Sequence, residues 1–112
     1  MIDPATARQT LERFVELTSA GPARVFGIAG KGRIARGYDA DFTIVDLKTK
    51  RRIENRWIAS RCGWTPYDGM ETAGWPVATI LRGSIVMRDG GLVGTPKGRK
   101  LRFLETLETT GA

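Results

Sequence analysis

Apolar residues near the N-terminus recur at spacings of three and four positions, which is the period of one face of an α-helix. This face is formed by Ala7, Leu11, Phe14, Val15 and Thr18. Asp3 followed by Pro4 predicts the start of the helix, because aspartate caps a helix N-terminus and proline needs no amide donor in the first turn. Residues 19–22 (SAGP) predict its end, and residues 22–26 leave open a second short helix that Gly27 would end.

From residue 41 onward the pattern changes to short apolar runs, which are typical of strands. The predicted strands are residues 41–47, residues 52–58 with less regular alternation, residues 77–82, residues 85–88, and a short one at residues 100–103. Gly83-Ser84 predicts a two-residue hairpin loop with glycine first, and residues 89–91 end that hairpin. Residues 61–76 hold several turn formers and predict a loop, whereas residues 104–112 are helical or frayed.

The expected fold class is therefore α+β, with one or two N-terminal helices followed by a small, mainly antiparallel β-sheet. At 112 residues the chain is long enough for one hydrophobic core but too short for a complete α/β barrel. A few short strands make a thin core, so we expect the exposed face of the sheet to pack on something else.

The apolar fraction of 41% is ordinary for a folded chain. The sequence contains neither a run near the roughly 20 apolar residues of a membrane span nor the apolar core of a signal peptide at its N-terminus. Its one cysteine, Cys62, excludes an internal disulfide and fits a reducing compartment. The expected location is therefore cytoplasmic.

The chain has 18 lysines and arginines against 12 aspartates and glutamates, a formal charge of +6. Such a surplus suits phosphates or an acidic partner, but the densest cluster is only Lys48, Lys50, Arg51 and Arg52, which favours a charge spread over solvated faces. The sequence has no histidine. Chemistry that needs an imidazole base, a Ser–His pair or a histidine-ligated metal therefore cannot be completed by this chain alone.

Residues 27–46 (GIAGKGRIARGYDADFTIVD) have the glycines, lysine and carboxylates of a phosphate site. A Walker loop would need glycine at Val25 and Ser or Thr at Gly32, so it fails at both positions. Residues 30–35 match a loose dinucleotide pattern, but that pattern requires a strand before it and a helix after it, and here the order is reversed. Residues 27–30 also fit the GXXG of an RNA-binding loop, which occurs often by chance. We favour tight turns built on glycines with positive φ.

Three further groups of side chains are candidates for chemistry. Asp39, Asp41 and Asp46 could be metal ligands, but hydrogen bonding in turns and at strand edges is favoured, because hard cations need more oxygen ligands. Cys62 is a thiol without a histidine partner, which argues against a nucleophile. The aromatic residues could form a stacking platform for single-stranded nucleic acid, although core or interface packing is favoured; they are Trp57, Trp64, Tyr67 and Trp75.

In order along the chain, these motifs resemble the C-terminal end of the cyclic amidohydrolases, and dihydroorotase most of all. Residues 19–27 (SAGPARVFG) are similar to the family's Ser-x-Asn-Pro-Ala-Arg-x-Phe-Gly, with Gly21 in place of the usual asparagine. The family continues with Lys-Gly-x-Ile, then Gly-x-Asp-Ala-Asp and an apolar strand, as do residues 31–34 and 37–46. The segments that resemble dihydroorotase in particular are residues 64–69 (WTPYDG), 74–76 (GWP) and 79–83 (TILRG).

The resemblance covers nearly all of residues 6–103 and implies two parts. Residues 1–30 would be the last helices of a metal-dependent hydrolase barrel, shaped like a TIM barrel, and residues 31–112 would belong to an accessory β-sandwich. The parent enzyme would open or close a cyclic amide such as dihydroorotate, in pyrimidine biosynthesis, with a binuclear zinc centre that activates hydroxide and an aspartate that moves the proton.

The resemblance also implies where the zinc ligands of the parent lie. They are histidines, a modified lysine and an aspartate at the ends of barrel strands, and all would precede Met1. Lys31, Asp39 and Asp41 follow the last barrel strand, so none is carried over as a ligand. We therefore assign no catalytic, cofactor-binding or metal-ligating residue to this chain, and expect zinc only in the parent.

Three functional hypotheses remain. The first is an inactive C-terminal fragment of a dihydroorotase-like enzyme, whose partner is the rest of the barrel and whose substrate binds only in the parent. The second is a stand-alone scaffold or regulatory module that pairs with amidohydrolase or aspartate transcarbamoylase subunits, as catalytically dead dihydroorotase homologues do. The third is a basic nucleic-acid-binding module. We expect neither nucleic acid nor membrane as a partner, and leave a homo-oligomer open.

Overall fold

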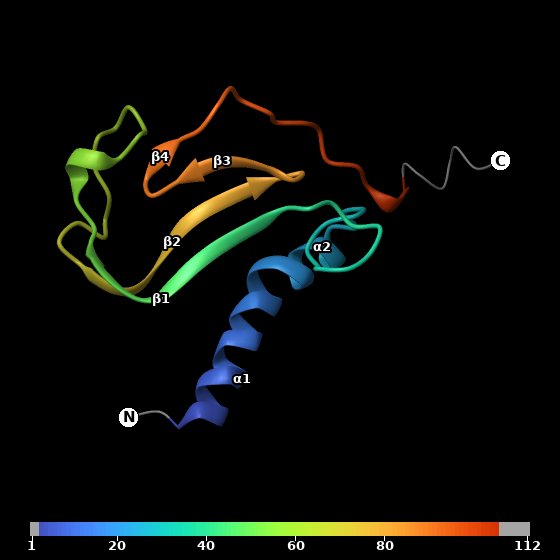
Figure 1. Cartoon of the computed structure of the whole chain (residues 1–112), viewed down its shortest axis with the longest axis horizontal. Coiled ribbons are helices and arrows are strands. Elements are labelled where there is room, and N and C mark those ends of the chain that lie inside the picture. The colour runs from blue at the N-terminus through green and yellow to red at the C-terminus, as the bar shows by residue number, and fades with distance from the viewer. Residues whose placement is uncertain (1–2, 106–112) are drawn as a thin grey trace. The chain divides into compact units, whose positions relative to one another are not determined.

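The computed structural model describes residues 3–105 (Figure 1). These residues form two compact units. The helical unit contains the described residues up to Asp41 and those from Pro96 onward, and the sheet unit is Phe42–Thr95. Helices at the N-terminal end precede a four-stranded antiparallel sheet, so the expected α+β class is confirmed. The assignment of residues 1–30 to a barrel and of residues 31–112 to a sandwich stays a prediction.

The helical unit begins with α1 (Pro4–Val15), whose start is the predicted one. The Asp3 carboxylate accepts hydrogen bonds from the amides of Ala5 and Thr6 at 2.9 and 3.0 Å, which satisfies two of the free donors at the helix start. These bonds favour the ionised carboxylate, so together with the Thr6 hydroxyl, the largest cause, they lower the pKa of Asp3.

The predicted helix end at residues 19–22 is wrong, because the chain continues through a π-helical turn, η1 (Glu16–Ala20), into α2 (Gly21–Val25). The Gly21 amide donates to the Glu16 carbonyl five residues earlier, and a Cβ on Gly21 would lie 2.6 Å from that oxygen. Pro22 stands in the first turn of α2, the part of a helix where proline is best tolerated.

Gly27 ends α2, as the sequence predicts. Its φ of 63° is in the left-handed region, its amide donates to the Arg24 carbonyl at 3.3 Å, and the amide of Ile28 donates to the Ala23 carbonyl at 2.8 Å. This pair of bonds is the Schellman motif that closes many helices.

The sheet unit holds β1 (Phe42–Arg52), β2 (Glu71–Leu81), β3 (Ser84–Arg88) and β4 (Gly91–Leu92), each antiparallel to the next in chain order (Figure 1). The expected strand at residues 52–58 is wrong, since β1 ends at Arg52 and a short 3-10 helix, η2 (Asn55–Trp57), follows.

Three further details of the sheet differ from expectation. The loop predicted for residues 61–76 ends early, because Glu71, Thr72 and Ala73 pair with Arg52, Arg51 and Lys50 of β1. The hairpin loop is Arg82-Gly83, with φ of 45° and 82°, because Ser84 already pairs with Leu81 in the sheet. Two positive φ angles make the type I′ turn that matches strand twist. The strand expected at residues 100–103 is reduced to one bridge between Phe103 and Ile28. The expected helical or frayed tail lies largely outside the described residues.

Neither unit has a substantial core of its own. Among residues 3–105, Ala29 is the single buried apolar residue, at 7% exposure. Large apolar side chains remain exposed in the helical unit, including Leu11, Phe14, Leu17, Val25, Phe26 and Ile34, and in the sheet unit, including Ile44, Val45, Leu47, Met70 and Leu92. Exposed apolar surface of this extent is typical of an interface. No described helix is long and apolar enough to cross a lipid bilayer.

Candidate functional site

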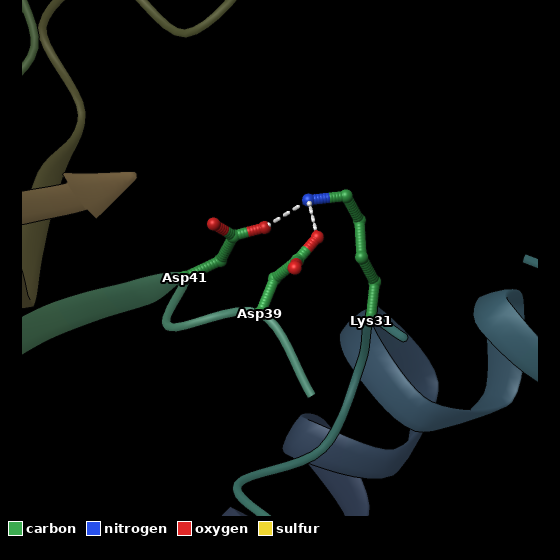
Figure 2. Close-up of polar contacts among 3 residues, drawn as sticks. All are labelled: Lys31, Asp39 and Asp41. Carbon is green, nitrogen blue, oxygen red and sulfur yellow. Dashed lines mark hydrogen bonds and ion pairs between the residues drawn. The ribbon is translucent and has the colours of Figure 1, made fainter. Parts of the chain in front are cut away.

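The strongest candidate for chemistry is a cluster of one lysine and two aspartates in the glycine-rich turn after α2 (Figure 2). Lys31 Nζ lies 3.0 Å from Asp39 Oδ2 and also forms an ion pair with Asp41 Oδ2. The three side chains are 22%, 30% and 27% exposed, so the cluster is partly shielded from water. Figure 2 shows both carboxylates pointing to the same ammonium group.

Backbone hydrogen bonds in the turn place the carboxylates opposite the lysine. The Asp39 amide donates to the Gly30 carbonyl at 2.8 Å, which brings residue 39 beside the residue that precedes Lys31. The Asp41 amide donates to the Asp39 carbonyl at 2.9 Å, so the two aspartates follow each other closely. The geometry of the cluster therefore comes from the fold of the turn.

Gly32 brings this turn against the end of the helical segment. Its φ is +89°, and a Cβ added there would lie 2.7 Å from the Ser19 carbonyl oxygen and 2.8 Å from the Ala23 Cβ. Real Cβ atoms do not approach other atoms so closely, so only glycine fits both the conformation and the space. Gly32 thus allows the turn to lie in close contact with the helical segment.

The electrostatics of the cluster oppose an anionic ligand. One ammonium and two carboxylates carry a net charge of about −1 at neutral pH. The hydrogen bond from Lys31 to Asp41 is the main reason that the pKa of Lys31 is raised; partial burial works against this, and Asp39 adds to it. Lys31 therefore stays protonated and engaged with its own carboxylates, which does not fit a phosphate-binding lysine or a general base.

Residues of the dinucleotide-like and RNA-binding-like patterns in residues 27–35 take part in local contacts of the fold. Gly27 closes a helix, the Ala29 amide donates to the Arg102 carbonyl at 2.8 Å, and Gly32 faces the Ser19 carbonyl. The preferred interpretation, tight turns with positive φ at Gly27, Gly32 and Gly37, is confirmed, and Gly30 has a positive φ as well.

Each of the three candidate aspartates has partners within the protein. Asp39 and Asp41 bind Lys31, and Asp46 Oδ1 accepts from the amides of Lys48 and Thr49 at 2.9 and 3.3 Å. These bonds hold an irregularity of β1, where the pairing with β2 shifts, and lower the pKa of Asp46. In the described part of the chain, no three His, Cys, Asp or Glu side chains are grouped so that they could hold a metal ion. The residues present thus do not fit the zinc centre that the resemblance implies for the parent.

Cys62 is exposed and has polar neighbours of its own. Its Sγ lies 2.9 Å from Ser60 Oγ and 3.6 Å from the Trp64 carbonyl oxygen, and the contact with Ser60 is the first cause of its lowered pKa. A nucleophilic cysteine is commonly activated by a neighbouring base. The histidine that usually fills this role is absent from the sequence.

The four aromatic residues of the stacking hypothesis lie in different elements, with Trp57 in η2 and Trp75 in β2. Trp57 and Trp75 pack edge to face, with ring centres 5.8 Å apart, and the Arg51 guanidinium lies 6.0 Å from the centre of the Trp75 ring. Trp64 and Tyr67 are 59% and 57% exposed. Edge-to-face pairing is typical of packing contacts, so Trp57 and Trp75 fit the structural role that the sequence favoured.

Sequence reasoning missed the residues that shape the loop between η2 and β2. The Asn55 amide donates to Asp68 Oδ1 and the Thr65 amide donates to Asn55 Oδ1, both at 2.8 Å. The Gly69 amide closes the loop by donating to the Ile53 carbonyl at 2.7 Å. Asn and Asp are frequent in turns for this reason, but nothing local pairs residue 55 with residue 68.

Comparison with known proteins gives a consistent result. The model of the Amidohydrolase family matches residues 4–86. A dihydroorotase of Methanothermobacter thermautotrophicus is 47% identical over 83 residues, which are 74% of this chain and 19% of that protein. A D-phenylhydantoinase of Escherichia coli is 41% identical over 99 residues, 87% of this chain and 22% of that protein.

A solved structure agrees with the sequence relatives. The L-hydantoinase (dihydropyrimidinase) from Arthrobacter aurescens superposes with a TM-score of 0.71 at 36% identity, over 75% of this chain and 19% of that one. The chain spans about a fifth of the length of the relatives that it matches. These matches show that it belongs to the amidohydrolase family, among its dihydroorotase-like and hydantoinase-like cyclic amidohydrolases.

Proposed function

We propose that this chain is a structural, non-catalytic part of a dihydroorotase-like cyclic amidohydrolase. Its helices would end the barrel of the parent enzyme, and its sheet would be part of the accessory β-sandwich. The parent would open or close the cyclic amide of dihydroorotate, and the binuclear zinc centre and the proton-moving aspartate would lie elsewhere in it. The rest of the barrel is the partner that this proposal requires.

The observation that carries the proposal is the pairing of Lys31 with Asp39 and Asp41 inside the turn. The turn matches the motif of the family, yet its lysine and both aspartates bind one another. Among the described residues, no three possible metal-ligating side chains are grouped. The exposed apolar side chains of both units support a role in packing against other protein. The choice of dihydroorotate over a hydantoin rests on the dihydroorotase-like motifs of residues 64–83.

The isolated chain provides the first test. After purification and incubation with zinc, elemental analysis should find zinc well below one ion per chain, and dihydroorotate turnover should not exceed a blank. Bovine carbonic anhydrase, carried through the same steps, controls for metal recovery. Stoichiometric zinc together with turnover above the blank would contradict the proposal.

A second candidate is a scaffold module that pairs with aspartate transcarbamoylase or amidohydrolase subunits. The same exposed apolar surface favours it, because such a module also requires a partner. Size-exclusion chromatography with a purified aspartate transcarbamoylase catalytic subunit distinguishes the two. A stable complex with that subunit would favour the scaffold, and its absence favours the structural part of an enzyme.

A further inference from the structure

One strongly charged surface is not used by the proposed function. Residues 97–102 (KGRKLR), here called the basic segment, carry four cations in six positions, and no acidic residue occurs between Asp89 and Glu105. The segment is exposed along its length. Within residues 3–105, the side chains of Arg99, Lys100 and Arg102 form no ion pair, so their charge faces solvent.

The basic segment is fixed at one end by backbone hydrogen bonds. The Arg102 carbonyl accepts from the Ala29 amide and the Leu104 amide donates to the Gly27 carbonyl, both at 2.8 Å. A terminal nitrogen of the Arg102 guanidinium lies 3.5 Å from the place that a Cβ on Gly30 would occupy. The segment is therefore anchored at its C-terminal end through its main chain, and the side chains of Arg99 and Lys100 remain exposed.

Four of the described carboxylates of the same unit have partners of their own. Asp39 and Asp41 bind Lys31, Glu16 binds Arg24, and Asp3 caps α1. They offer little to balance the basic segment within its own unit. An acidic partner would supply this charge, and opposite charges across an interface raise the rate of association and fix its register.

Apolar side chains accompany the cations. Leu101, Phe103 and Leu104 are 45%, 40% and 52% exposed. A nucleic acid would use the cations through its phosphates but would leave the leucines in water. A protein segment with both acidic and apolar side chains would use both features, since protein interfaces combine an apolar centre with a polar rim. We propose that the basic segment is a docking surface for an acidic and apolar segment of a partner protein.

Three probes separate the possible occupants. Binding of the 112-residue chain is measured by fluorescence anisotropy with a labelled Glu-Glu-Leu repeat peptide, a Glu-Glu-Ser repeat peptide of equal length, and an oligothymidine of equal charge. The Glu-Glu-Leu peptide is expected to bind most tightly, and its advantage over the serine peptide should persist as salt is raised. Tighter binding of the oligothymidine, or equal binding of the two peptides, would overturn the proposal.

A matched pair of variants locates the site. Replacing Arg99, Lys100 and Arg102 with glutamine should weaken binding of the Glu-Glu-Leu peptide about tenfold, from three exposed ion pairs of modest strength. The control replaces Lys48, Lys50 and Arg52 of β1 with glutamine and removes the same charge; it should keep the affinity. An equal loss of peptide affinity in both variants would show that only net charge matters and would contradict the proposed docking surface. If the triple variant of the basic segment is less stable than the wild-type chain, the single substitution Arg99→Gln is tested in its place. It should weaken peptide binding by a smaller factor, and its control, Lys50→Gln, should keep the affinity.

Discussion

Replacing Gly32 with alanine is expected to destabilise the helical unit by about 3 kcal/mol, through backbone strain and overpacking together. The new methyl group would have to occupy the space 2.7 Å from the Ser19 carbonyl oxygen and 2.8 Å from the Ala23 Cβ. It would also hold a non-glycine residue at a φ of +89°. Hydrogen exchange at the amides of Phe26 and Ile28, which are bonded within this unit, measures the loss locally.

Gly37→Ala is the matched control for this prediction. Gly37 has a similar φ of +84°, but no atom lies within 4 Å of the place that its Cβ would take. Only the cost of the left-handed conformation remains, about 1 kcal/mol. If both substitutions cost the same, the close contact between Gly32 and the helix would be unimportant for stability.

Lys31→Met is expected to lower the stability of the helical unit by about 2 kcal/mol, between the values for exposed and buried pairs, because it removes the ammonium group that both neighbouring carboxylates contact. Exchange of the Asp39 amide, which is bonded to the Gly30 carbonyl, reports on this turn directly. Adding Asp41→Asn to Lys31→Met should recover part of the loss, since it removes one of the two repelling charges. A double variant no more stable than Lys31→Met would contradict the electrostatic explanation.

The same cluster predicts how stability depends on pH. Asp41 first, and then Asp39, raise the pKa of Lys31 in the folded chain. The stability that Lys31 contributes is therefore complete below its pKa in the unfolded chain, about 10.4. The contribution is lost as pH rises through the higher folded pKa. Protection of the Asp39 amide should therefore fall more steeply in the wild-type chain than in Lys31→Met over that alkaline range. Parallel profiles would show that Lys31 does not carry the effect.

Local chemistry was enough to predict the helix ends that depend on a single residue type. Asp3 with Pro4 starts α1 and Gly27 ends α2, because capping and positive φ are properties of neighbouring residues. The segment around Gly21 was mispredicted as a helix stop. Proline signals a break in most contexts, and only the bond from Gly21 to Glu16 shows how the chain continues through it.

The sheet was predicted less well, since its details depend on pairing between distant residues. The start of β2 at Glu71 follows from pairing with Arg52, nineteen positions away, against several local turn signals. The hairpin loop was misplaced by one residue because Gly83 suits either loop position. The register of Leu81 with Ser84 decides between them.

For the candidate site, the sequence supplied an argument about the turn but not its side-chain contacts. The order of helix and strand around residues 27–46 argued against a phosphate site, and the charge balance of the folded turn supports that conclusion. The pairing of Lys31 with Asp39 and Asp41 was not predicted. It depends on the bond between Asp39 and Gly30, which closes the turn and which no residue spacing specifies.

A hybrid enzyme tests the non-catalytic structural role most directly. In the dihydroorotase of Methanothermobacter thermautotrophicus, the 83 matching residues are replaced by their counterparts from this chain, and kcat and KM for dihydroorotate are measured with zinc content and oligomeric size. If the segment is structural, a folded and metal-loaded hybrid keeps its kcat within about tenfold, the effect of roughly 1.4 kcal/mol in the barrier. A hybrid with native size and full zinc whose kcat falls about a hundredfold or more, the loss expected from removing a catalytic group, would contradict that role.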